Sequence, residues 1–249
     1  MTVALVGSGG FVGSHLARQH RFDHQFGAAD LRQLAGRRFD LLVCAGPGGI
    51  DGDGDWARIA TLTEVLRTVE AGRVVLISTT EVYPAPRGVD ETSPIGEEDG
   101  AADGRNRLRF ERFVRSRFLD TFVFRLPGLF GPGAPKTVLS DLTENNAACN
   151  PASRLQWYDV NDLWRDVERC TARGARLVNL APEPVAMRDI LERWFPRRHT
   201  DAKIEPVVQD VRTRHAALFG RGDGYILDAA QVLDRIGGYV AAATRRGAA

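Results

Sequence analysis

A short apolar segment followed at once by closely spaced glycines is the feature that most constrains how this chain can fold. Val3–Val6 is apolar throughout, and Gly7, Gly10 and Gly13 follow it at intervals of three residues, within a stretch whose apolar residues then recur with helical spacing. A glycine turn between a strand and a helix lets the backbone approach a pyrophosphate, whose negative charge is stabilised at the helix N-terminus. The pattern therefore predicts a dinucleotide-binding turn made by Gly7, Gly10, Phe11, Val12 and Gly13, the alternative being a glycine-rich turn without a ligand.

A dinucleotide site of this kind needs an acidic residue about 20 positions after the turn, where a carboxylate accepts hydrogen bonds from the adenosine ribose. Asp23 and Asp30 are the two candidates, and Asp30 fits better because it follows a weak strand pattern. An equally good interpretation is that Asp30 caps a short helix at Leu31–Leu34. The sequence therefore leaves the choice between NAD and NADP open.

Strand and helix patterns alternate through the first half of the chain. Continuous apolar segments at 40–44, 74–78 and 121–126 are typical of strands buried on both faces, and helical spacing occupies 56–69 and 107–118. This alternation predicts an α/β fold with a doubly wound parallel sheet. The alternation ends at Gly131, so we expect a Rossmann core in residues 1–131. Residues 132–249 would supply the remaining sheet elements and a small interleaved C-terminal lobe that binds substrate and is not an independent domain.

Polar side chains follow the strand expected at 74–78. Ser78, Thr79, Thr80 and Glu81 lie where a doubly wound sheet places its ligands, at the carboxyl end of a buried strand. A hydroxyl there can hydrogen-bond a reacting alcohol or carbonyl oxygen, and a carboxylate can act as a base. The alternative is a polar strand exit that turns at Pro84.

Composition narrows the possible partners and location of the protein. The formal net charge of +1 argues against nucleic-acid binding. The sequence has no run of about 18 apolar residues, so we expect no membrane span. Three cysteines without ligand-like spacing support neither a disulfide framework nor a metal site. With no signal peptide before the first strand, we expect a cytoplasmic protein.

Several segments in order resemble the extended short-chain dehydrogenase/reductase family, which includes nucleotide-sugar epimerases, dehydratases and reductases. These segments are the glycine pattern, Ser-Thr-Thr-Glu-Val-Tyr at 78–83, Arg-Leu-Pro-Gly-Leu-Phe-Gly-Pro-Gly at 125–133 and Trp-Tyr-Asp-Val-Asn-Asp-Leu at 157–163. The resemblance implies a Rossmann fold that binds NAD or NADP, a nucleotide-sugar substrate and a possible homodimer. It implies cofactor contacts at Ala45, Gly46, Ser78 and Pro127. Thr80 and Lys136 are the expected substrate contacts, although Lys136 fits a solvated loop equally well.

The chain departs from that family in its acid/base residues. The family uses a Tyr followed four residues later by a Lys, but the only lysines here are Lys136 and Lys203, and neither follows a Tyr at that spacing. Alignment on Glu111 places Asp103 at the Tyr position and Arg107 at the Lys position. An arginine can serve as a fixed cation and ribose donor but cannot exchange protons. Asp103 is a candidate catalytic acid, and a helix N-cap is the interpretation that the sequence favours.

Two functions remain open at this point. The first is an NAD(P)-dependent epimerase, dehydratase or reductase that uses Thr79, Glu81 and Asp103 for proton transfer. The second is a catalytically silent member of the family that serves as a dinucleotide-binding regulatory or partner subunit, as the missing Tyr and Lys suggest.

Overall fold

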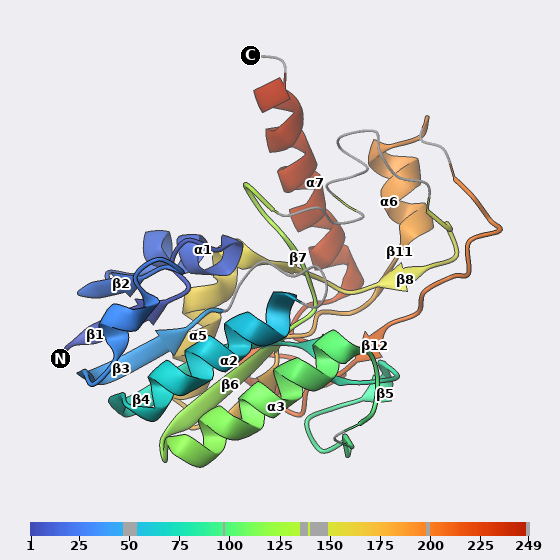
Figure 1. The fold of residues 1–249 in the computed structure, drawn as a ribbon. Coiled ribbons are helices and arrows are strands. Elements are labelled where there is room, and N and C mark those ends of the chain that lie inside the picture. The colour runs from blue at the N-terminus through green and yellow to red at the C-terminus, as the bar shows by residue number, and fades with distance from the viewer. Residues whose placement is uncertain (47–53, 97, 135–138, 140–148, 198–199, 248–249) are drawn as a thin grey trace. The chain divides into compact units, whose positions relative to one another are not determined.

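The largest sheet described has six parallel strands (Figure 1), in the order β10-β6-β4-β3-β1-β2. This computed structural model describes residues 1–46, 54–96, 98–134, 139, 149–197 and 200–247. The strands are β1 (Val3–Val6), β2 (His24–Phe26), β3 (Arg38–Cys44), β4 (Glu70–Thr79), β6 (Thr121–Leu126) and β10 (Leu177–Asn179). Strand β2 pairs with one side of β1, and the next strand in the chain, β3, pairs with the opposite side. The strand order therefore reverses beside β1, which is where such sheets bind ligands. The predicted α/β fold with a doubly wound sheet is confirmed.

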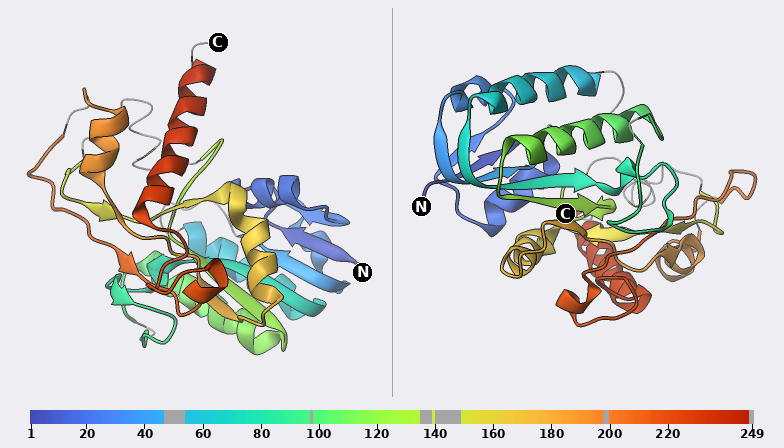
Figure 2. Two further views of the ribbon diagram at one scale, coloured as in Figure 1. Left: turned by 180° about the vertical axis from the view of Figure 1, so that it is seen from behind. Right: turned by 90° about the horizontal axis from the view of Figure 1, so that it is seen from below.

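Helices cover both faces of this sheet, as the two views of Figure 2 show. Helices α2 (Gly54–Arg67) and α3 (Ala102–Arg117) pack side by side on one face, and α1 (Phe11–Gln19) and α5 (Leu163–Thr171) on the other. Apolar side chains of β3, β4, α2 and α3 form one buried cluster that includes Leu42, Leu62, Val74 and Val114. Because both faces are covered, β6 is buried at every position, which explains its continuous apolar sequence.

The chain divides into two compact units. Unit 1 comprises Met1–Ala85, Pro94–Arg125 and Asn161–Val178, and it holds the six-stranded sheet up to its edge strand β10. Unit 2 comprises Pro86–Ser93, Leu126–Val160 and Asn179–Ala249. The second half of the sequence therefore contributes to both units.

The described residues of unit 2 form short strand pairs and helices. Its strands are β5 (Arg87–Val89), β7 (Gly128–Phe130), β8 (Arg154–Leu155), β9 (Trp157–Asp159), β11 (Val185–Ala186) and β12 (Asp210–Val211). β5 pairs with β12, β7 with β9, and β8 with β11. Helices α6 (Met187–Trp194) and α7 (Ala229–Gly247) contribute Ile190, Leu191 and Ile236 to a separate core around Trp157. These strands have only two or three residues each, so periodicity in the sequence gives little signal for them.

The clearest difference from the sequence prediction concerns the start of α3. The apolar spacing predicted a helix from residue 107, whereas α3 begins at Ala102. Its first five residues are polar or small, so they carry no apolar periodicity. Three arginines spaced along the helix bind the preceding segment: Arg105 donates to the Gly100 carbonyl, Arg109 to Glu98 and Arg112 to the Ile95 carbonyl. These tertiary contacts accompany a helical turn that local sequence signals do not predict.

Candidate active site

The glycine turn after β1 packs directly against the residues that follow β3. Gly7 has a φ of +86°, which favours glycine, and a Cβ placed on it would lie 3.1 Å from the Ala45 carbonyl carbon and from the Gly46 nitrogen. A Cβ on Gly13 would lie 2.0 Å from the Gly7 carbonyl oxygen. The N-terminal part of helix α1 thus packs directly on the backbone of the glycine turn. Both glycines are required for a strand, a turn and a helix to pack this closely.

The N-terminus of α1 lies beside open space. Gly10 is its N-cap residue and makes no side-chain capping hydrogen bond, and α1 has no acidic residue in its first turn. A Cβ on Gly9 would meet no atom within 4 Å. Phe11 and Val12 begin the helix and are half-buried. An uncapped helix N-terminus next to an open glycine turn fits the pyrophosphate of a dinucleotide.

The two acidic candidates for the ribose lie at opposite ends of β2. Asp23 precedes the strand and accepts a hydrogen bond from the Val3 amide at 2.8 Å, so it ties the amino ends of β1 and β2 together. Asp30 follows the strand, is exposed, and accepts a 3.2 Å hydrogen bond from the Gln33 side-chain amide. It is the N-cap residue of the short 3₁₀ helix Leu31–Leu34, but its carboxylate makes no capping bond. Of the two carboxylates, only that of Asp30 lies after the carboxyl end of β2, so Asp30 stays the candidate for the ribose.

Hydroxyl side chains and a carboxylate follow one another at the carboxyl end of β4. Ser78 and Thr79 are the half-buried last residues of the strand, and Thr80 is buried at the start of the 3₁₀ turn Thr80–Val82. The Glu81 amide donates to Thr79 Oγ1 at 3.1 Å, which fixes the hydroxyl and leaves its hydrogen available to donate. The Glu81 side chain itself is exposed. The expected proton-transfer groups therefore lie at the carboxyl edge of the sheet.

The start of α3 brings Asp103 next to this turn. A Cβ on Gly104 would lie 2.2 Å from the Glu81 carbonyl oxygen, so only a glycine lets the helix backbone approach so closely. The interpretation of Asp103 as the helix N-cap is wrong, because the N-cap residue is Ala101 and Asp103 lies inside the first turn. The error follows directly from placing the helix start five residues too late. Asp103 is half-buried and remains a candidate proton-transfer group.

Arg107 lies one helical turn after Asp103 on α3 and is buried. Only 8% of the residue is exposed, and its charge acts on Cys44 at the end of β3. Burial raises the pKa of the Cys44 thiol to about 11, and the hydrogen bond to the Gly46 carbonyl and the Arg107 charge oppose that rise. The Arg107 charge therefore acts at the carboxyl end of β3, and its assignment to the family's lysine position stays a prediction.

A buried polar network that sequence analysis did not predict lies beside these residues. Arg125, near the end of β6, donates two hydrogen bonds from Nε and Nη2 to the carboxylate of Glu111 on α3, at 3.0 and 2.7 Å. Its Nη1 donates to the Tyr83 hydroxyl at 2.8 Å. The side chains of Arg125 and Glu111 are only 5% and 1% exposed. Although burial alone would lower the pKa of Arg125, Glu111 and Tyr83 raise it, so the guanidinium stays protonated.

The remaining predicted contacts lie in the second half of the sequence. Pro127 is buried between β6 and β7 and belongs to unit 2. Lys136 lies outside the described residues.

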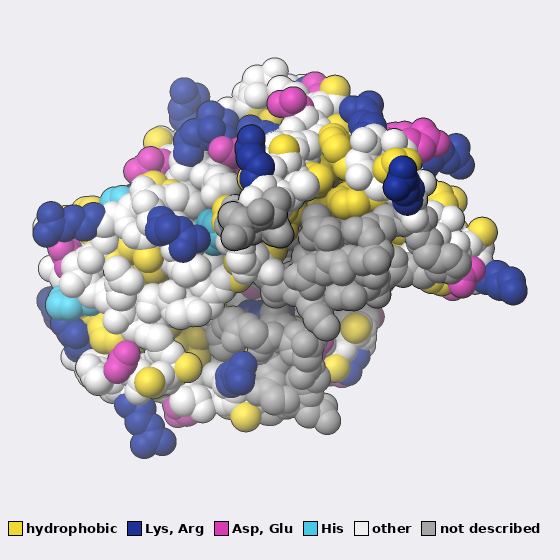
Figure 3. All heavy atoms as spheres, turned by 90° about the horizontal axis from the view of Figure 1, so that it is seen from above, with side chains coloured by type: hydrophobic (Ala, Val, Ile, Leu, Met, Phe, Trp, Pro, Cys, Tyr) yellow, Lys and Arg dark blue, Asp and Glu magenta, His cyan; other side chains and the backbone are white. Residues whose placement is uncertain are grey.

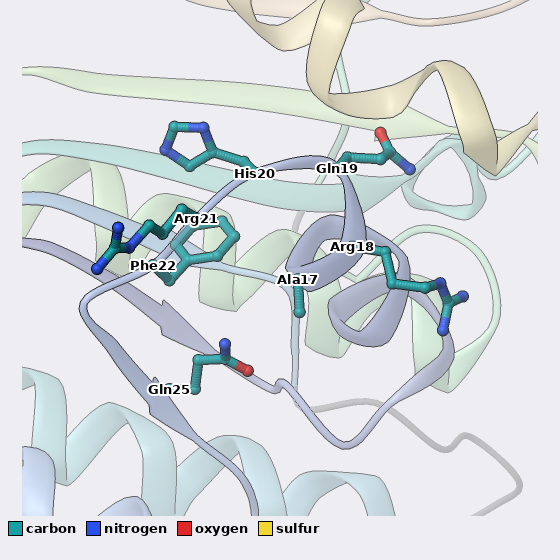
Figure 4. Close-up of a pocket in the computed structure, with 7 residues that line it drawn as sticks. All are labelled: Ala17, Arg18, Gln19, His20, Arg21, Phe22 and Gln25. Carbon is teal, nitrogen blue, oxygen red and sulfur yellow. The ribbon is translucent and has the colours of Figure 1, made fainter.

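A hollow in the described surface lies away from the residues discussed so far. A hollow of about 350 Å³ lies at the C-terminal end of α1, where Figure 4 shows side chains that include His20, Phe22 and Gln25 arranged around it. This is the end of α1 away from the glycine turn. On the face shown in Figure 3, arginine side chains are dispersed and do not form one basic patch. Within the described residues no helix is long and apolar enough to cross a membrane, and no cluster of three potential metal ligands occurs.

Solved structures share this architecture. MoeE5, solved with UDP-glucuronic acid and NAD, superposes with a TM-score of 0.73 at 17% identity, covering 99% of this chain and 100% of that one. UDP-glucuronic acid 4-epimerase from Bacillus cereus, also solved with UDP-glucuronic acid and NAD, gives a TM-score of 0.71 at 15% identity, with 98% and 99% covered. The chain therefore has the same fold as these solved structures.

The fold is also shared with WbmH from Bordetella bronchiseptica in complex with NAD+, at a TM-score of 0.68 and 18% identity over 89% of this chain and 93% of that one. No family model matches the sequence, and no curated protein matches it. The Rossmann fold that the sequence resemblance implies is thus shared with solved nucleotide-sugar and NAD complexes.

Proposed function

We propose that the protein is an NAD-dependent enzyme that acts on a nucleotide-linked sugar, with the chemistry of an epimerase or dehydratase. The observation that carries the proposal is the packing of the Gly7 turn on Ala45 and Gly46, with open space above Gly9. This arrangement provides a pyrophosphate-binding turn where the strand order of the sheet reverses. The solved structures with the same fold that hold both NAD and a UDP-sugar support the choice of ligands.

NAD rather than NADP is favoured by the surroundings of Asp30. Its exposed carboxylate follows β2 and can accept hydrogen bonds from ribose hydroxyls. A 2′-phosphate at the same place would be repelled by that charge. Arg107 would hold the other end of the cofactor, where a guanidinium can donate to the nicotinamide ribose hydroxyls.

When bound, NAD would supply the hydride acceptor for oxidation of a sugar carbon. The protein must then move a proton, and three groups near the carboxyl edge of the sheet can take part. Thr79, whose oxygen already accepts the Glu81 amide, donates its hydrogen to the reacting oxygen. Glu81 is the exposed carboxylate that acts as base, and Asp103 is a second carboxylate on the neighbouring helix turn.

The replacement of the family's Tyr and Lys by Asp103 and Arg107 favours a second candidate function. A chain that binds NAD without catalysis would serve as a dinucleotide-binding regulatory or partner subunit. The two functions predict the same cofactor affinity and differ only in turnover.

The test combines the purified protein with NAD and, in separate reactions, UDP-glucose or UDP-glucuronic acid, and follows cofactor reduction by absorbance and the sugar product by NMR. We expect turnover, and we expect Glu81→Gln to lower it by about 10²–10⁴-fold with NAD affinity retained. Glu64→Gln, at an exposed glutamate of α2, is the matched control. NAD binding without turnover would favour the silent subunit, whereas turnover insensitive to Glu81→Gln and Thr79→Ala would disprove the assigned site.

A further inference from the structure

The candidate proton-transfer residues lie on two segments, and Arg125 is bonded to both of them. Glu81 lies two residues before Tyr83, whose hydroxyl accepts from Arg125 Nη1 at 2.8 Å. Arg107 lies one helical turn before Glu111, whose carboxylate binds Arg125 Nε and Nη2. One guanidinium near the end of β6 therefore joins the turn that carries Glu81 to the helix that carries Arg107.

The geometry of this junction allows little freedom. A guanidinium is a rigid planar fork, and its two-pronged contact with Glu111 fixes its orientation. Its central carbon also lies 5.0 Å from the centre of the Tyr83 ring, so the arginine contacts both the ring and the hydroxyl. Tyr83 is only 3% exposed. A buried charge that lost either partner would be left poorly solvated, so alternative arrangements are strongly disfavoured.

A second close contact with α3 is made by the backbone of Glu81 itself. The Glu81 carbonyl packs on Gly104 of α3 so tightly that a Cβ there would lie 2.2 Å from the oxygen. The turn is therefore held against α3 at two places, by backbone contact of Glu81 with Gly104 and, just after the turn, by the polar network at Tyr83. Burial of a salt bridge contributes little net stability in general, whereas it can specify one arrangement of the elements that it joins.

We propose that Arg125 is a positioning residue, which holds the Glu81 turn in register with Asp103 and Arg107 through its bonds to Tyr83 and Glu111. This inference rests on the proposed function for its catalytic consequence. Its structural part, restraint of the turn by Arg125, stands independently of turnover. Displacement of a reacting group by about 1 Å can lower a rate by about 100-fold, so a small loosening of the turn has a measurable effect.

The test uses Tyr83→Phe, which removes the hydroxyl that accepts from Arg125 and keeps the buried ring. Amide hydrogen exchange is measured at Glu81, whose N–H binds Thr79 Oγ1, and at Tyr83, whose N–H binds the Thr80 carbonyl. We expect faster exchange at both amides, a kcat lowered by about 10-fold, and KM and NAD affinity changed by less than about twofold. Arg125→Lys, which cannot form the two-pronged contact, is expected to act in the same direction.

The matched control is Asp120→Asn. Asp120 precedes β6 at the opposite edge of the sheet, and its carboxylate likewise joins two arginines, Arg73 at 2.7 Å and Arg176 at 3.0 Å. It should leave kcat and the exchange of both amides unchanged. Unchanged exchange in Tyr83→Phe would overturn the proposal, as would faster exchange with an unaltered kcat in an active enzyme. If the native protein shows no turnover, the proposed function fails by itself, and the exchange measurement decides the restraint.

Discussion

The carbonyl oxygen of Glu81 lies so close to the backbone of Gly104 that a Cβ at position 104 would come within 2.2 Å of it. The contact packs the turn after β4, which carries Glu81, on the first turn of α3, which carries Asp103. A glycine in a helix normally lowers stability by roughly 0.5–1 kcal/mol relative to alanine. Here the lack of a side chain is what allows the two segments to pack.

Gly104→Ala should therefore destabilise the protein, against the helix propensity of alanine. We expect a loss of about 1–3 kcal/mol in the free energy of unfolding, the range for overpacked sites, measured by urea denaturation. Gly238→Ala on α7 is the control, because a Cβ there meets no atom within 4 Å. It should be neutral or stabilise by up to about 1 kcal/mol. Equal effects of the two substitutions would contradict the packing described for Gly104.

The glycine turn offers a pair of substitutions that separate folding from cofactor binding. Gly13→Ala should lower both stability and NAD affinity, because its Cβ would lie 2.0 Å from the Gly7 carbonyl oxygen. Gly9→Ala should leave stability nearly unchanged, because the space beside it is open, yet it should weaken NAD binding by placing a methyl group where the pyrophosphate is proposed to lie. Calorimetric titration with NAD and thermal unfolding measure the two effects. Full NAD affinity in Gly9→Ala would place the pyrophosphate elsewhere.

Arg107 should contribute to NAD binding through charge-assisted hydrogen bonds. Arg107→Ala is expected to weaken NAD binding by about 1–2 kcal/mol, measured by the same titration. Arg109→Ala, two residues along α3, removes an exposed side chain that pairs with Glu98 and should leave the affinity unchanged. An unaltered NAD affinity in Arg107→Ala would show that the family's lysine position has been assigned to the wrong residue.

Unit 2 should lose part of its stability in acid because of Asp210. Its hydrogen bond with Arg212 lowers the pKa of Asp210 below the usual value, and a 2.5 Å hydrogen bond from the Tyr225 hydroxyl acts in the same direction. A lowered pKa means that the stabilisation is present above pH about 3.9 and is lost as the pH falls through the folded-state pKa. Asp210→Asn should thus cost about 1 kcal/mol at pH 7 and progressively less below pH about 4, measured by urea denaturation across pH. A difference from the native protein that is independent of pH would contradict this assignment.

The sequence by itself determined the class of fold and the edge of the sheet where the site lies. Buried parallel strands must be apolar along their whole length, and a turn of closely spaced glycines has few structural uses, so Val3–Val6 and the glycines after it were informative without any tertiary information. The polar residues after β4 were also recognisable, because a hydroxyl cluster at the end of an apolar strand contrasts with the strand itself.

Only the tertiary structure decided where α3 begins and what Arg125 does. The helix starts at Ala102 among polar residues, where arginines bind the preceding segment and Gly104 packs on Glu81, and neither contact leaves a periodic signal in sequence. The network of Arg125, Glu111 and Tyr83 joins residues up to 42 positions apart. Local propensity acts over one or two helical turns, whereas a buried charge finds its partners through the packing of whole elements, so such partners are decided by the fold.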